Sequence, residues 1–168
     1  MNAQRKEKGF TIIEVVLVLA IAGLIFLMVF IALPALQRSQ RDQARKSEVG
    51  TIASSITSYQ SNNRGNAPTA VQIGQYITGS NSAELESGAT VIVRATTYTA
   101  PISLTADLPS TPNVADNVLY ADQIKVYFGY KCDPSSNSSL IRGTGRQAAI
   151  AVALESGPNT GSVYCQTN

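Results

Sequence analysis

The sequence predicts an α+β fold in which the second half of one long N-terminal helix packs on a small antiparallel β-sheet head. Three observations predict it. Segment 10–36 is apolar except for Glu14, and segment 37–62 continues without proline and with an amphipathic pattern. Segments rich in β-branched and aromatic residues then follow, separated by Gly, Pro, Asn and Ser. The 168 residues are enough for one domain of this kind.

The apolar segment begins at Phe10, and no charged residue lies between Val15 and Gln37. At about 1.5 Å per residue this stretch crosses a hydrocarbon layer of about 30 Å, so we expect a membrane-spanning helix over 10–37. A cleavable secretory signal is the alternative, although the apolar core of such signals usually has only about 7–15 residues. Ala32-Leu33-Pro34-Ala35 fits a signal-peptidase site, which keeps this alternative open.

Segment 38–62 is expected to continue the same helix with one apolar face. Its apolar side chains follow the i, i+3, i+4, i+7 spacing: Val49, Ile52, Ala53, Ile56 and Tyr59. A continuous helix over 10–62 would be about 80 Å long. Pro34 is expected to bend it, because proline removes one backbone hydrogen bond. Asn62 to Asn66, with Pro68 just beyond, predict its end.

Residues 63–168 are expected to form a globular head built on one sheet of three or four strands. The clearest strand candidates are 89–99 and 125–131, and weaker ones are 147–155 and 162–166. The three prolines in 101–117 predict a long connection, and 133–145 is expected to be a polar loop. The strand tyrosines are expected to serve the core and cross-strand pairs.

The composition argues against an enzyme. The chain has no histidine, and no set of nucleophile, base and orienting group can be assembled from the rest. We expect no cofactor and no metal. The loop acids Asp107, Asp116, Asp122 and Asp133 have a spacing that fits no calcium loop, and solvated acids are the simpler interpretation.

The excess of basic residues lies before Phe10, so the charge balance of the head gives no reason to expect nucleic-acid binding, although a local basic patch stays open.

Cys132 and Cys165 are the only cysteines. An even number of cysteines in an exported protein predicts a disulfide, with two buried thiols as the alternative. Basic residues stand on both sides of the apolar segment, so they do not decide its orientation in a membrane. The predicted disulfide and the Ser/Thr/Asn-rich head favour export of the C-terminal part.

Glu14 is the residue that points most directly to function. A carboxylate inside an apolar segment is costly unless it is paired, and the segment contains no Lys or Arg. Cleavage after Gly9 would create an ammonium group at Phe10, one helical turn away. The alternative is that Glu14 is an interfacial residue of an ordinary signal anchor, solvated by water and lipid headgroups.

The heptapeptide from Lys8 to Glu14, KGFTIIE, resembles the class III signal of type IV prepilins and pseudopilins. The resemblance implies a leader over 1–9, cleavage between Gly9 and Phe10 by a prepilin peptidase, and N-methylation of Phe10. It also implies that Glu14 aligns an incoming subunit with the terminal amine of a neighbour. The resemblance is dense to about Arg45. Beyond the helix it is only architectural, with the two cysteines similar to the disulfide-bounded region of pilins.

The resemblance implies a structural subunit of a type IV pilus that supports adhesion, twitching motility or DNA uptake. Its partners would be further copies in a helical filament, prepilin peptidase, the assembly platform with its ATPase, the membrane, and a host or bacterial surface receptor. We expect a single-pass membrane precursor and an extracellular filament. The alternatives are a minor pilin, a pseudopilin of secretion or competence, or a signal-anchored surface binding domain.

Overall fold

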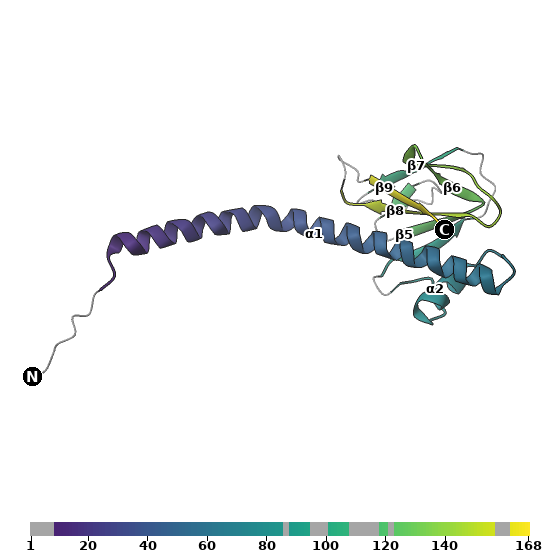
Figure 1. Ribbon diagram of the computed structural model, residues 1–168, viewed down its shortest axis with the longest axis horizontal. Helices are drawn as coiled ribbons and strands as arrows, with labels where there is room; N and C mark the ends of the chain where they lie inside the picture. Colours follow the sequence, from purple (N-terminus) through teal and green to yellow (C-terminus); the bar gives the residue numbers. More distant parts are fainter. Residues whose placement is uncertain (1–8, 86–87, 95–100, 108–117, 121–122, 157–161) are drawn as a thin grey trace, which may run out of the picture. The chain divides into compact units, whose positions relative to one another are not determined.

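The structure is a computed structural model that describes residues 9–85, 88–94, 101–107, 118–120, 123–156 and 162–168. The chain divides into two compact units, Met1–Gln37 and Arg38–Asn168, and each is described by itself. One long helix, α1 (Ile12–Asn62), begins in the first unit and ends in the second. The predicted helix over 10–62 is therefore confirmed to within two residues (Figure 1).

The first unit contains the apolar part of α1, and its large side chains are exposed along the whole length. In the described part of the chain, α1 is the one helix whose length and composition would allow it to cross a membrane. Pro34 lies inside α1, and helical residues continue on both sides of it. The bend expected there stays a prediction.

In its described residues, the second unit contains the end of α1, a short helix and nine strands. The short helix is α2 (Ala70–Thr78). The strands are β1 (Thr90–Arg94), β2 (Ile102–Ser103), β3 (Thr105–Asp107), β4 (Val118–Tyr120), β5 (Gln123–Phe128), β6 (Tyr130–Asp133), β7 (Ser136–Arg142), β8 (Ala148–Leu154) and β9 (Ser162–Thr167).

The main sheet has four strands in the order β1-β5-β8-β9. Strands β5, β8 and β9 are antiparallel neighbours, but β1 runs parallel to β5, with Thr90 opposite Gln123. The predicted α+β class is confirmed, whereas the prediction of one antiparallel sheet is wrong in detail because the sheet is mixed. A second, antiparallel sheet has the order β2-β7-β6, and β3 and β4 form a parallel pair.

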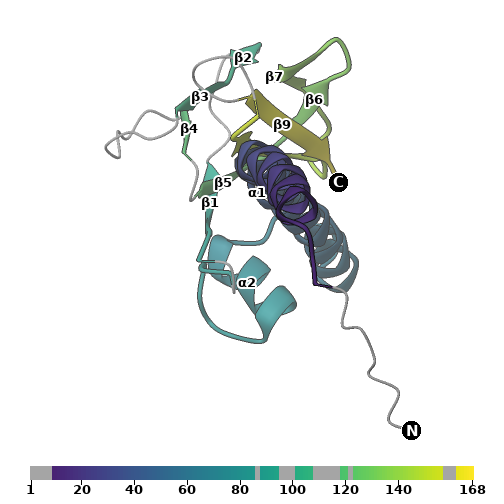
Figure 2. The ribbon, with the colours of Figure 1, turned by 90° about the vertical axis from the view of Figure 1, so that its left-hand side faces the viewer.

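One face of the main sheet packs on the second half of α1 and on α2 (Figure 2). The predicted apolar stripe supplies this contact, and Val49, Ile52 and Ile56 are fully buried in it. These side chains meet alternate residues of β5 and β8, such as Val126 and Ile150. The side-chain period of two in a strand explains why only every second residue reaches the helix.

The other face of the main sheet packs on the smaller sheets. On this face β8 contributes Ala149, Ala151 and Ala153, which are fully buried in a second core with Tyr127 and Leu140. Strand β8 is therefore buried on both faces, with larger side chains toward the helices and alanines toward the smaller sheets. The second unit accordingly has three layers: helices, the four-stranded sheet, and the smaller sheets.

Several predicted details of the head are corrected. The 133–145 segment, expected to be a polar loop, contains β7, and the 101–117 connection contains β2 and β3. Gly129, with φ +78°, ends β5 and divides the candidate strand 125–131 into two strands. Helix α2 was not predicted. The remainder of 89–99 beyond β1 lies outside the described residues.

Candidate processing and assembly site

The start of α1 is a capping box formed by Thr11 and Glu14. The backbone N–H and the hydroxyl of Thr11 donate to Oε2 of Glu14 at 3.0 and 2.8 Å, and the N–H of Glu14 approaches the Thr11 hydroxyl at 3.4 Å. These reciprocal bonds satisfy donors that have no partner inside the helix. The Gly9–Phe10 bond lies just before this box, at the entrance to α1.

The Thr11 contacts were missed in the sequence analysis, although Thr11-x-x-Glu14 is the sequence signature of a capping box. That analysis expected the Glu14 carboxylate to need a cation. In the uncleaved chain it already accepts two hydrogen bonds from Thr11. These bonds hold the carboxylate within one turn of the residue that would become the N-terminus. The pairing of Glu14 with a Phe10 amine stays a prediction.

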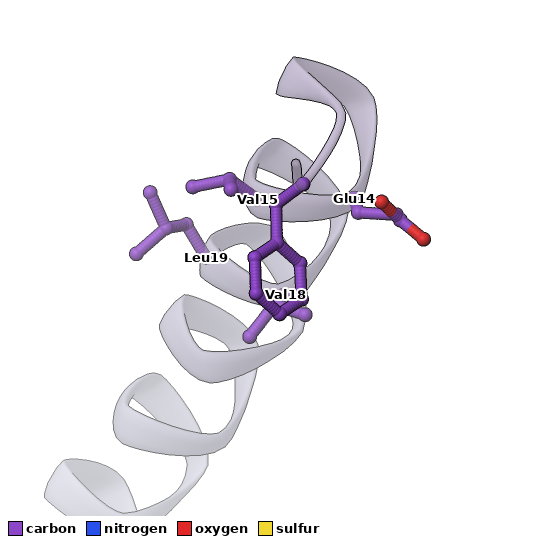
Figure 3. Close-up of a pocket in the computed structure, with 5 residues that line it drawn as sticks. Glu14, Val15, Val18 and Leu19 are labelled. Carbon is purple, nitrogen blue, oxygen red and sulfur yellow. The ribbon is translucent and has the colours of Figure 1, made fainter. Parts of the chain in front are cut away.

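The surroundings of Glu14 are apolar and open. Phe10, Val15, Val18 and Leu19 border a shallow hollow beside it. In Figure 3 the Glu14 carboxylate points away from Val15 and Leu19. Phe10 is 90 % exposed. This end of α1 therefore offers one carboxylate beside an uncovered apolar surface, which suits burial against lipid or against another apolar helix.

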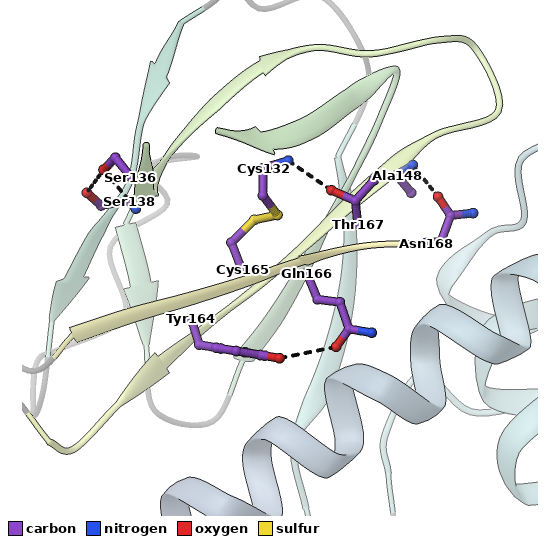
Figure 4. Close-up of a disulfide and its surroundings, with 9 residues drawn as sticks. All are labelled: Cys132, Ser136, Ser138, Ala148, Tyr164, Cys165, Gln166, Thr167 and Asn168. Carbon is purple, nitrogen blue, oxygen red and sulfur yellow. Dashed lines mark hydrogen bonds between the residues drawn. A yellow bond between two sulfur atoms is a disulfide. The ribbon is translucent and has the colours of Figure 1, made fainter. Parts of the chain in front are cut away.

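The second unit contains the expected disulfide between Cys132 of β6 and Cys165 of β9 (Figure 4). Their Cα atoms are 5.9 Å apart. The bridge joins the β2-β7-β6 sheet to the edge of the main sheet. The N–H of Cys132 also donates to the Thr167 hydroxyl at 3.0 Å. The disulfide thus fixes the packing of two layers of the head.

A group of charged residues that the sequence analysis did not single out as a site joins α1 to the end of β8. Both carboxylate oxygens of Asp42 accept backbone N–H groups, from Glu155 at 2.7 Å and from Ser156 at 3.0 Å. Arg41 binds the Glu155 carboxylate with Nε at 2.9 and 3.0 Å and Nη2 at 2.6 Å. Arg45 reaches the same carboxylate at 3.0 Å. We call Arg41, Asp42, Arg45, Glu155 and Ser156 the Asp42 cluster.

The cluster shifts the acidity of its members. Burial raises the pKa of Asp42, but hydrogen bonds from Ser156 and Glu155 and the charge of Arg45 outweigh it, so the pKa lies below its ordinary 3.8. The hydrogen bond from Arg41 lowers the pKa of Glu155 from its ordinary 4.5, and it raises the pKa of Arg41. Both carboxylates are ionised at neutral pH. This cluster could not be predicted from the sequence, because Arg41 and Arg45 of α1 lie more than a hundred residues before Glu155.

Within the described residues, no group of three or more Asp, Glu or Cys side chains is placed to hold a metal ion. Asp133 instead accepts hydrogen bonds from the hydroxyl and N–H of Ser135 at 2.6 and 2.9 Å, which lower the pKa of its carboxyl group. Asp116, Asp122 and the side chain of Asp107 lie outside the described part of the chain, so the absence of a calcium site stays a prediction.

Comparison with protein families identifies the start of the chain. Residues 4–30 match the family model described as the prokaryotic N-terminal methylation motif. This motif is the class III signal peptide of type IV pilins, so its recognition from sequence is confirmed. Neither the comparison with curated proteins nor the comparison with solved structures gave a match.

The motif and the fold together point to one class of precursor. The class III signal, the long apolar helix and the pilin-like α+β architecture support a type IV pilin-like or pseudopilin precursor. The motif implies processing by prepilin peptidase and handling by the pilus assembly machinery. The signal and the apolar helix together indicate a membrane-anchored precursor.

Proposed function

We propose that the mature chain is a structural subunit of an extracellular type IV pilus filament. Prepilin peptidase cleaves between Gly9 and Phe10, Phe10 is methylated, and the subunit waits in the membrane through α1. An assembly platform and its ATPase then draw it into a helical filament of identical subunits. The filament supports adhesion to a host or bacterial surface, twitching motility or DNA uptake. The subunit itself carries out no catalysis and binds no cofactor.

The observation that carries this proposal is the pairing of the methylation motif with a helix that is apolar and uncovered along its first half. An apolar helix of this length needs either lipid or neighbouring helices around it. Removal of the leader takes away Arg5, Lys6 and Lys8, the basic residues that precede the span. The helix can then leave the bilayer when packed helices receive it.

The same features support a second candidate, a minor pilin or a pseudopilin, which uses the same processing and assembly steps. The two candidates differ in abundance. A major subunit dominates the protein sheared from the cell surface, whereas a minor subunit accompanies a more abundant one. A signal-anchored binding domain would remain uncleaved in the membrane and would not enter the sheared fraction.

The experiment compares two variants of the precursor in its native cells. Glu14→Ala removes the carboxylate of the capping box, and Glu48→Ala is the matched control in the second half of the same helix. We expect Glu14→Ala to be cleaved normally but to be lost from sheared filaments, and Glu48→Ala to behave as wild type. Equal incorporation of both variants, or the absence of the wild-type chain from sheared material, would contradict the proposal.

A further inference from the structure

The contacts that hold α1 to the head change in kind along the helix. From Val49 onward the buried residues of α1 are mostly apolar, whereas among the described residues before Val49 only Asp42 is buried. Among the described residues, α1 therefore packs on the apolar core only from Val49 onward. The eight residues before it, Arg41–Glu48, about 12 Å of helix at the standard rise, are held by polar contacts.

Those polar contacts are the Asp42 cluster and two smaller interactions. The Arg45 guanidinium donates to the carbonyl of Ala153 at 3.2 Å, next to its ion pair with Glu155. The Lys46 ammonium lies 5.6 Å from the centroid of the Tyr164 ring on β9. Within the described residues, Arg41 and Arg45 of α1 pair with Glu155, and Arg45 also lies 3.8 Å from Asp42. Arg38 and Lys46 stand one turn before and one turn after Asp42 on the same helix.

We propose that the Asp42 cluster is a releasable clasp, which holds Arg41–Glu48 of α1 to the head and opens while the head stays folded. This inference does not depend on the filament function. Opening exposes little apolar surface, because the core contacts of α1 begin only at Val49. The Arg41 side chain is 52 % exposed and that of Glu155 is 22 % exposed, so water and protons reach this ion pair from outside, whereas the Asp42 side chain is buried.

Ion pairs hold the clasp closed, so a change of pH that neutralises its carboxylates should open it. Two carboxylates and two guanidinium groups balance, and each carboxylate has a pKa below its ordinary value because of the partners described above. Protonation of Asp42 removes the acceptor charge that holds two backbone N–H groups, and protonation of Glu155 removes the charge that pairs with both arginines. Acid therefore opens the clasp, at a pH below the ordinary values of 3.8 and 4.5.

The test is hydrogen exchange on the full-length chain in detergent micelles, resolved at single amides and corrected for the intrinsic effect of pH. The backbone amides of Glu155 and Ser156 report the clasp directly, because both donate to Asp42. The amides of β5, which pair with β8, report the folded head. The variants are Asp42→Ala and, as the matched control, Glu84→Gln, which changes an exposed acid of the head.

In Asp42→Ala we expect both reporter amides to lose protection at least about tenfold, because hydrogen bonds to a charged group exceed the roughly 1.4 kcal/mol of a tenfold change. The β5 amides and Glu84→Gln should be unchanged. Unchanged protection at Glu155 and Ser156, or an equal loss throughout the head, would overturn the proposal.

An acid titration of the wild type tests the same proposal without a variant. As the pH falls from 7, the Glu155 and Ser156 amides should lose protection before the β5 amides do. If Asp42→Ala does not fold, this titration decides alone. Loss of protection at all amides together, or retained protection at the reporters until the head unfolds, would show that the cluster is not a separate clasp.

Discussion

Removal of the disulfide is the change whose cost follows most directly from the structure. The double substitution Cys132→Ser and Cys165→Ser opens a loop with a sequence separation of 33. The chain-entropy relation for a loop of this size gives a loss of about 3–4 kcal/mol in the free energy of unfolding. The hydrogen bond from the Cys132 N–H to Thr167 does not need the sulfur atoms and is expected to remain. The double substitution should therefore lower the stability of the head but leave its fold unchanged.

Urea unfolding of the full-length chain in detergent measures this cost. The chain has no Trp, so tyrosine fluorescence reports the head, where Tyr127 and Tyr130 are buried. With a slope of about 1–3 kcal/mol per M urea, the midpoint should fall by about 1–4 M. Wild type treated with a thiol reductant is the control and should match the variant. A midpoint within about 0.3 M of the oxidised wild type would refute the reasoning.

Three other predictions use the same measurement. The free energy of unfolding should fall as the pH drops below 4.5, because Glu155 has a lowered pKa and its ion pairs stabilise the head only while its carboxylate is ionised. In Glu155→Gln this dependence on pH should be weaker. Gly74→Ala should destabilise the head by about 1–3 kcal/mol, since a Cβ there would lie 1.7 Å from the Ser82 carbonyl oxygen, whereas Gly145→Ala meets nothing within 4 Å and should be neutral. Ile52→Ala, at a fully buried position, should cost about 2–5 kcal/mol. The first prediction is wrong if the free energy of unfolding does not change with pH, and the second if the two glycine changes have equal effects. The third is wrong if Ile52→Ala costs less than about 1 kcal/mol.

The helix was predictable from sequence because its signals are local and strong. The apolar run, the charge-free stretch after Glu14 and the stripe through Val49 and Ile56 each depend on spacing within a few turns. The methylation motif was predictable for the same reason, since its residues are adjacent. The capping box of Thr11 and Glu14 was equally visible in the sequence and was overlooked because Glu14 was considered only as a partner for an amine.

The details of the head were less predictable because long-range packing decides them. Strand β7 begins with the polar run from Ser136 to Ser139, which has weak strand preference, yet pairing with β6 and β2 holds it extended. Helix α2 is only nine residues long, although Thr69 and Gln72 form a capping box at its start. Such short helices depend mainly on tertiary packing.

The parallel pairing of β1 with β5 and the Asp42 cluster had no local signal at all. Parallel neighbours are joined through a distant connection, so the direction of β1 depends on the path of the intervening chain. Arg41 and Arg45 were considered only as basic residues that follow the apolar span. Their partner Glu155 lies more than a hundred residues later, where it was expected only to end a strand.

The central claim is that the chain is a prepilin-type precursor cut between Gly9 and Phe10. N-terminal peptide mass spectrometry on protein isolated from its native cells tests it most directly. The account predicts a mature chain that begins at Phe10 and carries one added methyl group. A chain that begins at Met1, or just after Ala35, would contradict the account and make the protein an anchored or secreted binding domain.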